Sequence, residues 1–109
     1  MVIENIDQAS AAGEAPPLRL TLRQLGVFVA TARAGSTRAA AERVARSQSA
    51  ASSALADLEA ALGATLFDRV GRRLVLNENG RALLPRAQAL LEQAGELQGL
   101  LAAAHGAPL

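Results

Sequence analysis

Apolar residues recur along most of this chain at the three- and four-residue spacing of amphipathic helices. The first such stripe consists of Leu22, Leu25, Phe28, Val29 and Ala32. Thr21 and Gln24 fit a capping box, so a helix is expected to begin directly after Thr21. Gly35 suits the left-handed cap that often ends a helix. The pattern therefore predicts a first helix between Thr21 and Gly35.

Two further helices are predicted next, joined by a tight turn at Ala45-Arg46. Ser36 is placed to cap the first of them, which should reach about Val44 with Ala40, Ala41 and Val44 facing inward. Ser47 is placed to cap the second, from Gln48 to Leu62, and Gly63 is a stop signal. The buried face of that helix should consist of Ala51, Leu55, Leu58 and Leu62. Two short helices around a tight turn are typical of a DNA-reading motif.

Two short apolar runs follow, Leu66 to Val70 and Leu74 to Leu76, with Gly71-Arg72-Arg73 between them. We interpret them as a β-hairpin, or wing. Asn77 and Glu78 then favour the start of a long last helix. Helical from Glu78 to Ala104, it would measure about 40 Å at the usual rise per residue. Pro85 lies inside it and lacks an N–H group, which predicts a bend.

The last helix carries a heptad-like seam. Its members are Leu83, Ala87, Leu90, Ala94, Leu97 and Leu101, spaced 4, 3, 4, 3 and 4. The core formed by residues 20–70 is too small to cover a helix of this length. We therefore expect a partner helix, and hence a homodimer formed through residues 77–104.

Composition excludes several classes of function. The chain has 109 residues, no cysteine, and one histidine, His105, near its end. Disulfides and thiolate metal sites are thereby excluded. Asp57 and Glu59 stand two apart on a predicted helix, so their carboxylates do not converge as an acid–base pair would. We expect neither an enzyme nor a cofactor. No apolar run approaches the roughly 20 residues needed to span a membrane, which favours a cytoplasmic protein.

The formal net charge of +1 conceals an uneven distribution. Residues 1–20 carry three acids against Arg19, a net of −2, whereas the remainder carries ten arginines against seven acids, a net of +3. All the basic side chains are arginine, which binds phosphate through a rigid two-pronged fork. Residues 1–17 show no sustained periodicity and end in two prolines, so we expect a disordered arm.

A series of motifs occupies residues 20 to 94: Leu22-Arg23-Gln24-Leu25, Phe28, Gly35-Ser36, Ala40-Ala41, Ser47-Gln48, Ser52, Leu58-Glu59, Leu62-Gly63, Leu66-Phe67, Arg69, Gly80 and Leu84-Pro85. With these residues, the stretch resembles the N-terminal DNA-binding domain of LysR-type transcriptional regulators, a bacterial family. Residues 66–71 and 75–78 resemble its YeiE-type branch in particular.

This resemblance implies a mainly α fold, a winged helix-turn-helix with a three-helix core and a two-stranded β wing, followed by a long dimerisation linker helix. The expected parts are a disordered arm (1–19), the winged domain (20–76), the linker helix (77–104) and the start of a hinge (105–109). Family members continue into an effector-binding domain, so the chain is expected to be a fragment. A small-molecule inducer would bind only through that missing domain, and tetramers would require it.

The predicted function is sequence-specific binding to a pseudo-palindromic DNA operator, with residues 47–62 as the recognition helix in the major groove. Gln48 is the leading base-reading candidate, because its amide pairs with the N7 and N6 edge of adenine. The other candidates on this face are Ser49, Ser52 and Ser53. Ser49 and Ser53 depart from the family, which often has proline and arginine there. The recognition helix therefore lacks a positive charge, and Asp57 and Glu59 make its far half acidic.

Contacts to the DNA backbone are expected from the helix-turn-helix and the wing. Ser36 and Thr37 begin the second helix, where free amide groups suit a phosphate. The other candidates are Arg38, Arg46, Arg69, Arg72 and Arg73. Wing arginines can follow phosphates or enter a narrow minor groove, although Asp68 offers one of them an ion-pair partner instead.

A protein-interaction module is the alternative. A helical dimer whose serine-rich helix binds another protein would explain the heptad seam and the weak net charge. It would leave the wing arginines and the length of the family resemblance unexplained. Salt dependence distinguishes the two functions, because DNA binding releases counterions and protein binding of this kind does not.

Overall fold

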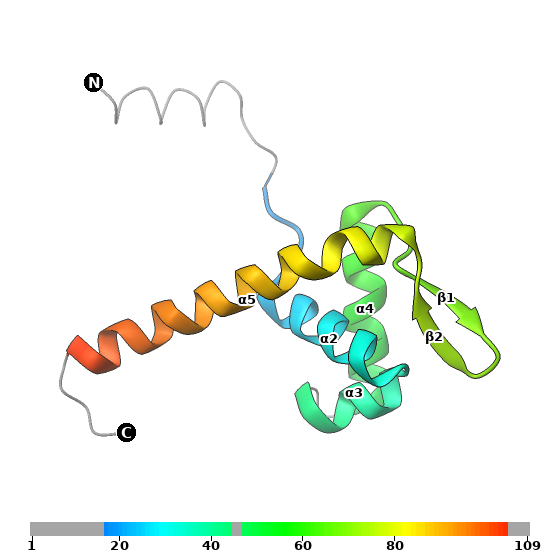
Figure 1. The fold of residues 1–109 in the computed structure, drawn as a ribbon, viewed down its shortest axis with the longest axis horizontal. Coiled ribbons are helices and arrows are strands. Elements are labelled where there is room, and N and C mark those ends of the chain that lie inside the picture. Colours follow the sequence, from blue (N-terminus) through cyan, green and yellow to red (C-terminus); the bar gives the residue numbers. More distant parts are fainter. Residues whose placement is uncertain (1–16, 45–46, 105–109) are drawn as a thin grey trace, which may run out of the picture.

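The computed structural model describes residues 17–44 and 47–104. The described part is mainly helical with one antiparallel two-stranded sheet, which confirms the predicted fold class (Figure 1). The elements are α2 (Leu22–Ala34), α3 (Thr37–Val44), α4 (Gln48–Leu62), β1 (Phe67–Val70), β2 (Arg73–Leu76) and α5 (Glu78–Ala104). Residues 1–16 of the expected arm (1–19), the turn at Ala45-Arg46 and the hinge at 105–109 lie outside the described residues.

Each helix begins at the side chain that the sequence predicts. Thr21 and Gln24 form both bonds of the capping box on α2. The hydroxyls of Ser36 and Ser47 accept bonds from the amides three residues further on, at 3.1 Å in both helices. Asn77 does the same for α5 through its Oδ1 atom, which accepts from the amide of Gly80 at 2.9 Å. These short polar caps fix where α3 and α4 start, and therefore where their free amides lie.

Helix α2 lies at the centre of the fold, in contact with α3, α4, α5 and β2. Its neighbours cover more of it than one amphipathic stripe, so Val27, Ala30 and Thr31 are buried along with the predicted Leu25, Phe28 and Val29. Two predicted core positions are wrong. Leu22 is 49% exposed because it sits at the free first turn of α2, and Leu62 is 39% exposed at the last turn of α4.

The wing is a hairpin in which Phe67 pairs with Leu76, Arg69 with Leu74, and Val70 with Arg73. Gly71 supplies the positive φ angle, 64°, that the tight turn needs. Two of its contacts join the hairpin to α2 and to Gly35, the C-cap of that helix. The amide of Leu74 donates to the carbonyl of Gly35 at 2.9 Å, and the ring of Phe67 packs on that of Phe28 with centroids 5.6 Å apart.

Helix α5 leaves the body of the molecule as a long rod after its first half has packed along α2 (Figure 1). The predicted seam consequently has a part that packs on the chain's own core and a part that is exposed. Ala87 is fully buried in the chain's own core and leaves no surface for a partner, so its assignment to a dimer seam is wrong. Leu83 also packs against that core, whereas Leu97 and Leu101 are 68% and 62% exposed. The helix continues through Pro85, and the bend there stays a prediction.

The start of α5 touches the segment that leads into the wing. A methyl group added at Gly80 would collide with the carbonyl oxygen of Leu66 and lie 2.7 Å from the side chain of Leu76. Gly80 is buried, and the collision involves backbone, which cannot move without shifting the wing. Glycine at this position is therefore a packing requirement.

We expect Gly80→Ala to lower the free energy of unfolding by about 1–3 kcal/mol, the usual cost of overpacking a tight contact. Gly95→Ala is the matched control on the same helix, since nothing lies within 4 Å of the added methyl. It should raise stability by about 0.5–1 kcal/mol, because alanine favours the helix. Thermal unfolding of both variants measures the difference. Equal stability of the two would contradict the close contact.

Candidate nucleic-acid interface

A cleft of about 330 Å³ lies where the starts of α3 and α4 meet the wing. Its lining consists of Ser36, Thr37, Arg38, Gln48, Arg69, Arg72 and Leu74. All of these except Leu74 were predicted from the sequence as DNA contacts, although they come from separate segments. The fold therefore brings a base-reading candidate, a helix start and three arginines to one concave surface.

Two helix N-termini contribute to this cleft. In α3, the Ser36 hydroxyl and carbonyl engage the amides of Ala39 and Ala40, which leaves those of Thr37 and Arg38 without a partner in the described part of the chain. In α4, the hydroxyl and the carbonyl of Ser47 accept bonds from the amides of Ala50 and Ala51 in the same way. Free amides and the positive ends of two helix dipoles make the cleft suited to an anionic group.

The serines of α4 differ in their surroundings. The hydroxyl of Ser52 donates to that of Thr37 at 3.4 Å and so links α4 to the start of α3. Ser49 lies 3.4 Å from Ser47 between hydroxyl oxygens, a local contact within the first turn. Ser53 is exposed. Ser52 thus lies beside the cleft, and Ser49 and Ser53 lie on the exposed surface of the helix.

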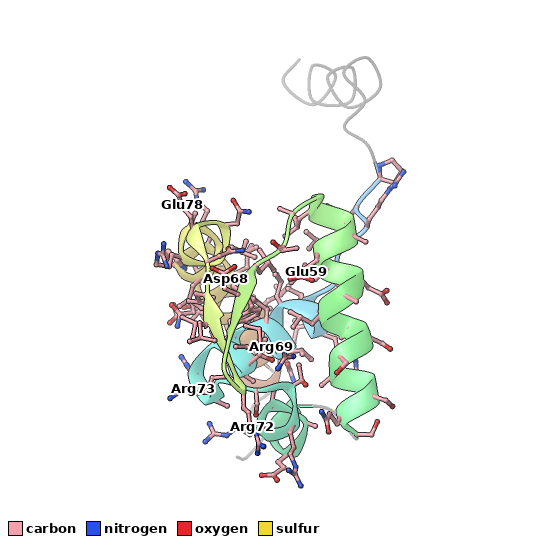
Figure 2. All side chains as sticks on the ribbon, turned by 90° about the vertical axis from the view of Figure 1, so that its right-hand side faces the viewer. Glu59, Asp68, Arg69, Arg72, Arg73 and Glu78 are labelled. Carbon is pink, nitrogen blue, oxygen red and sulfur yellow. The ribbon has the colours of Figure 1, made fainter. Side chains whose placement is uncertain are left out.

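The wing arginines point in different directions. Arg69 extends from the wing toward α4, Arg72 lies near the tip, and Arg73 lies on the other side of the hairpin (Figure 2). A Cβ atom placed at Gly35 would be only 3.0 Å from Nη2 of Arg73, so this guanidinium packs on the end of α2 instead of lining the cleft. Arg69 and Asp68 are consecutive strand residues, which places their side chains on opposite faces. Arg46 lies outside the described residues.

A second hollow, of about 350 Å³, continues from the cleft between α4 and β1. Thr37, Arg69 and Leu74 line both, and Glu59 lines the second. The Glu59 carboxylate accepts a bond from the amide of Leu66 at 2.8 Å. It is therefore engaged with the base of the wing, whereas the sequence suggested only an acidic surface.

Sequence reasoning missed four residues that shape this interface: Gly35, Glu59, Leu74 and Gly80. Their roles depend on contacts between distant segments, which periodicity does not reveal. For Glu59 one clue was present, because an acid in the last turn of a helix is unfavourable unless it has a partner. No group of three or more residues that could hold a metal ion occurs in the described ranges, and none of the helices there could cross a membrane.

Comparison with known proteins agrees with this geometry. Residues 22–81 match the family described as "Bacterial regulatory helix-turn-helix protein, lysR family". Escherichia coli K12 YeiE, named as an uncharacterized HTH-type transcriptional regulator, is 57% identical over 90 residues, which are 83% of this chain and 31% of that protein. The chain thus spans about a third of this relative's length.

Solved structures show the same fold. The DNA complex of the CbnR DNA-binding domain matches with a TM-score of 0.71 and 38% identity, covering 79% of this chain and 99% of that one. Oxidized OxyR of Corynebacterium glutamicum matches with a TM-score of 0.77 and 33% identity, over 85% of this chain and 28% of that one.

If the cleft binds a phosphate backbone, Arg72→Ala should weaken binding to every duplex and reduce the salt slope by about one unit. Arg43→Ala is the matched control, because Arg43 is an exposed arginine that lines a different groove, beside α2 and α5. Both variants lose one positive charge. Fluorescence anisotropy at several salt concentrations measures the slopes, and an equal change in both would show that only net charge matters.

Proposed function

We propose, from the premise that this chain belongs to the LysR family of bacterial helix-turn-helix regulators, that it binds a two-fold symmetric DNA operator as a dimer. Family membership confirms the resemblance found in the sequence. The chain is the DNA-binding part of a transcriptional regulator and not an enzyme. The operator, the residue roles and the dimer are the parts that we propose.

The observation that carries the proposal is the lining of the cleft. Thr37 and Arg38 come from α3 and Ser36 caps that helix, while Gln48 comes from α4, and Arg69 and Arg72 from the wing. A helix start, a recognition helix and a wing have to act together on one duplex, since phosphate contacts set the register in which bases are read. Their convergence on one concave surface supports this use.

In this arrangement α4 enters the major groove with Gln48 leading. Its exposed amide offers one donor and one acceptor to adenine, a pairing worth about 1–3 kcal/mol of discrimination. Ser49, Ser52 and Ser53 supplement it with hydroxyls from the same helix. Because α4 carries no positive charge, affinity depends on the free amides at the start of α3 and on Arg38, Arg69 and Arg72.

Dimerisation through α5 is supported by its exposed second half. Leu90, Leu97, Leu100 and Leu101 are 47% to 68% exposed on one helix, which is unusual for leucines without a partner. Leu90, half-buried Ala94, Leu97 and Leu101 keep the 4, 3, 4 spacing of a coiled-coil seam. We assign the dimer contact to these four. A dimer of this kind would present two copies of α4 to half-sites about 34 Å apart.

The complete regulator is proposed to be longer. Since the chain spans about a third of its E. coli relative, an effector-binding domain with the inducer site would follow the hinge. That domain would also allow tetramers. A place in the cytoplasm, at the nucleoid, follows from the DNA ligand.

Selection from a random duplex pool at two salt concentrations tests the function. We expect enrichment of a two-fold symmetric site and a log–log salt slope near −4.5, as for about five neutralised phosphates. Gln48→Ala should relax one base preference in each half-site, whereas Gln93→Ala, an exposed glutamine on α5, should leave the selected sequence unchanged. A flat slope with no enriched site would favour the protein-interaction module.

Leu97→Asp should convert the dimer to a monomer, because it places a charge in the proposed seam. The chain's own core does not cover Leu97, so the domain itself should stay folded. Gln98→Asp adds the same charge at a neighbouring exposed position and should leave the dimer intact. Sedimentation equilibrium gives the mass of each variant; a dimeric Leu97→Asp protein would rule out this seam.

A further inference from the structure

Helix α4 and the wing face each other across a hollow and not through a packed interface. Ser52, Leu55, Ala56 and Glu59 line it from α4, and Thr65, Phe67 and Arg69 from the wing side. Ser52 and Arg69 belong to the proposed DNA interface. The distance between recognition helix and wing therefore has to be fixed at the ends of this gap.

One end of the gap is closed by Glu59. Its Oε2 atom accepts a bond from the amide of Leu66 at 2.8 Å, and Leu66 is the residue directly before β1. The carbonyl of Leu66 in turn accepts from the amide of Asn77 at 3.0 Å, directly after β2. A single carboxylate on α4 is thus bonded to the point where both strands of the wing meet the rest of the fold.

The negative charge of Glu59 lies at an electrostatically unfavourable position. A carboxylate in the last turn of a helix opposes the helix dipole, and near DNA it repels phosphates. Asp57, two residues earlier, is exposed. Glu59 is half-buried and lies at the base of the wing (Figure 2). Its bond to Leu66 offsets the unfavourable charge.

We propose that Glu59 is a positioning residue for DNA binding, which holds the wing at the separation from α4 where Arg69 and Arg72 reach phosphates while Gln48 lies in the groove. The inference rests on the proposed function. Without this bond the wing keeps its contacts with Gly35 and Phe28 and the bond between Leu66 and Asn77 at its base, so it would turn about these contacts and remain folded.

The first test needs no DNA. Because the chain has no cysteine, spin labels at Ser53→Cys and Val70→Cys report the distance between α4 and the wing. Glu59→Ala should broaden the distance distribution, Glu59→Gln should retain it because an oxygen acceptor remains, and Asp57→Ala should leave it unchanged. An equally narrow distribution in Glu59→Ala overturns the inference, whatever the protein binds.

The second test measures binding to a duplex. Removal of a negative charge alone strengthens DNA binding, which is the result expected for Asp57→Ala. Glu59→Ala should instead weaken it about tenfold and reduce the salt slope by about two units, as though two phosphate contacts were lost. Glu59→Gln should recover most of the affinity. Arg72→Ala in the Glu59→Ala background should then cost less than it does alone.

Additive effects of Glu59→Ala and Arg72→Ala, or a gain in affinity for Glu59→Ala, would overturn the inference. If Glu59→Ala fails to fold, Glu59→Asp takes its place, since it keeps the charge but is one methylene too short to hold the same bond. A flat salt slope in the unmodified chain would contradict the proposed function itself, while the spin-label distances would still decide whether Glu59 fixes the wing.

Discussion

The arrangement of this domain depends on the contacts of one residue, Leu66. Its side chain is buried in the core, its amide is bonded to Glu59 of α4, and its carbonyl accepts from Asn77 at the start of α5. Gly80 approaches the same carbonyl more closely than any side chain would allow. The recognition helix α4, the wing and the long helix α5 are thereby joined at one residue. A displacement of any of them would disturb the contacts of Leu66.

The proposed DNA interface uses a small number of charged groups, which lie where they can reach phosphates. The net charge of the whole chain is only +1, because the acidic residues 1–20 offset part of the +3 carried by the remainder, and α4 has no basic residue. The interface instead combines arginines from α3 and the wing with first-turn amides of α3 and α4 that have no partner among residues 17–44 and 47–104. Helix ends supply partial positive charge that needs no side chain and loses no side-chain entropy. Weak net charge is thus compatible with DNA binding, provided that the geometry between helix starts and wing is maintained.

Much of this fold could be predicted, because it is encoded locally. Thr21, Ser36, Ser47 and Asn77 cap their helices through bonds spanning three residues, and the hairpin follows from Gly71. The features that the sequence could not show are those that depend on contacts between distant segments. The burial of Ala87, the exposure of Leu62 and the contact between Arg73 and Gly35 arise from neighbours distant in the chain. The same is true of Glu59, whose partner lies beyond the end of its helix.

We propose that the cleft between α3, α4 and the wing is the surface that binds DNA. Amide NMR shifts recorded while a duplex is added test this assignment most directly. We expect the largest changes at Thr37, Arg38, Gln48 and Arg72. Arg33 and Arg43 line a different groove, beside α2 and α5, and should change little. Largest changes at Arg33 and Arg43, with the cleft unaffected, would contradict the account.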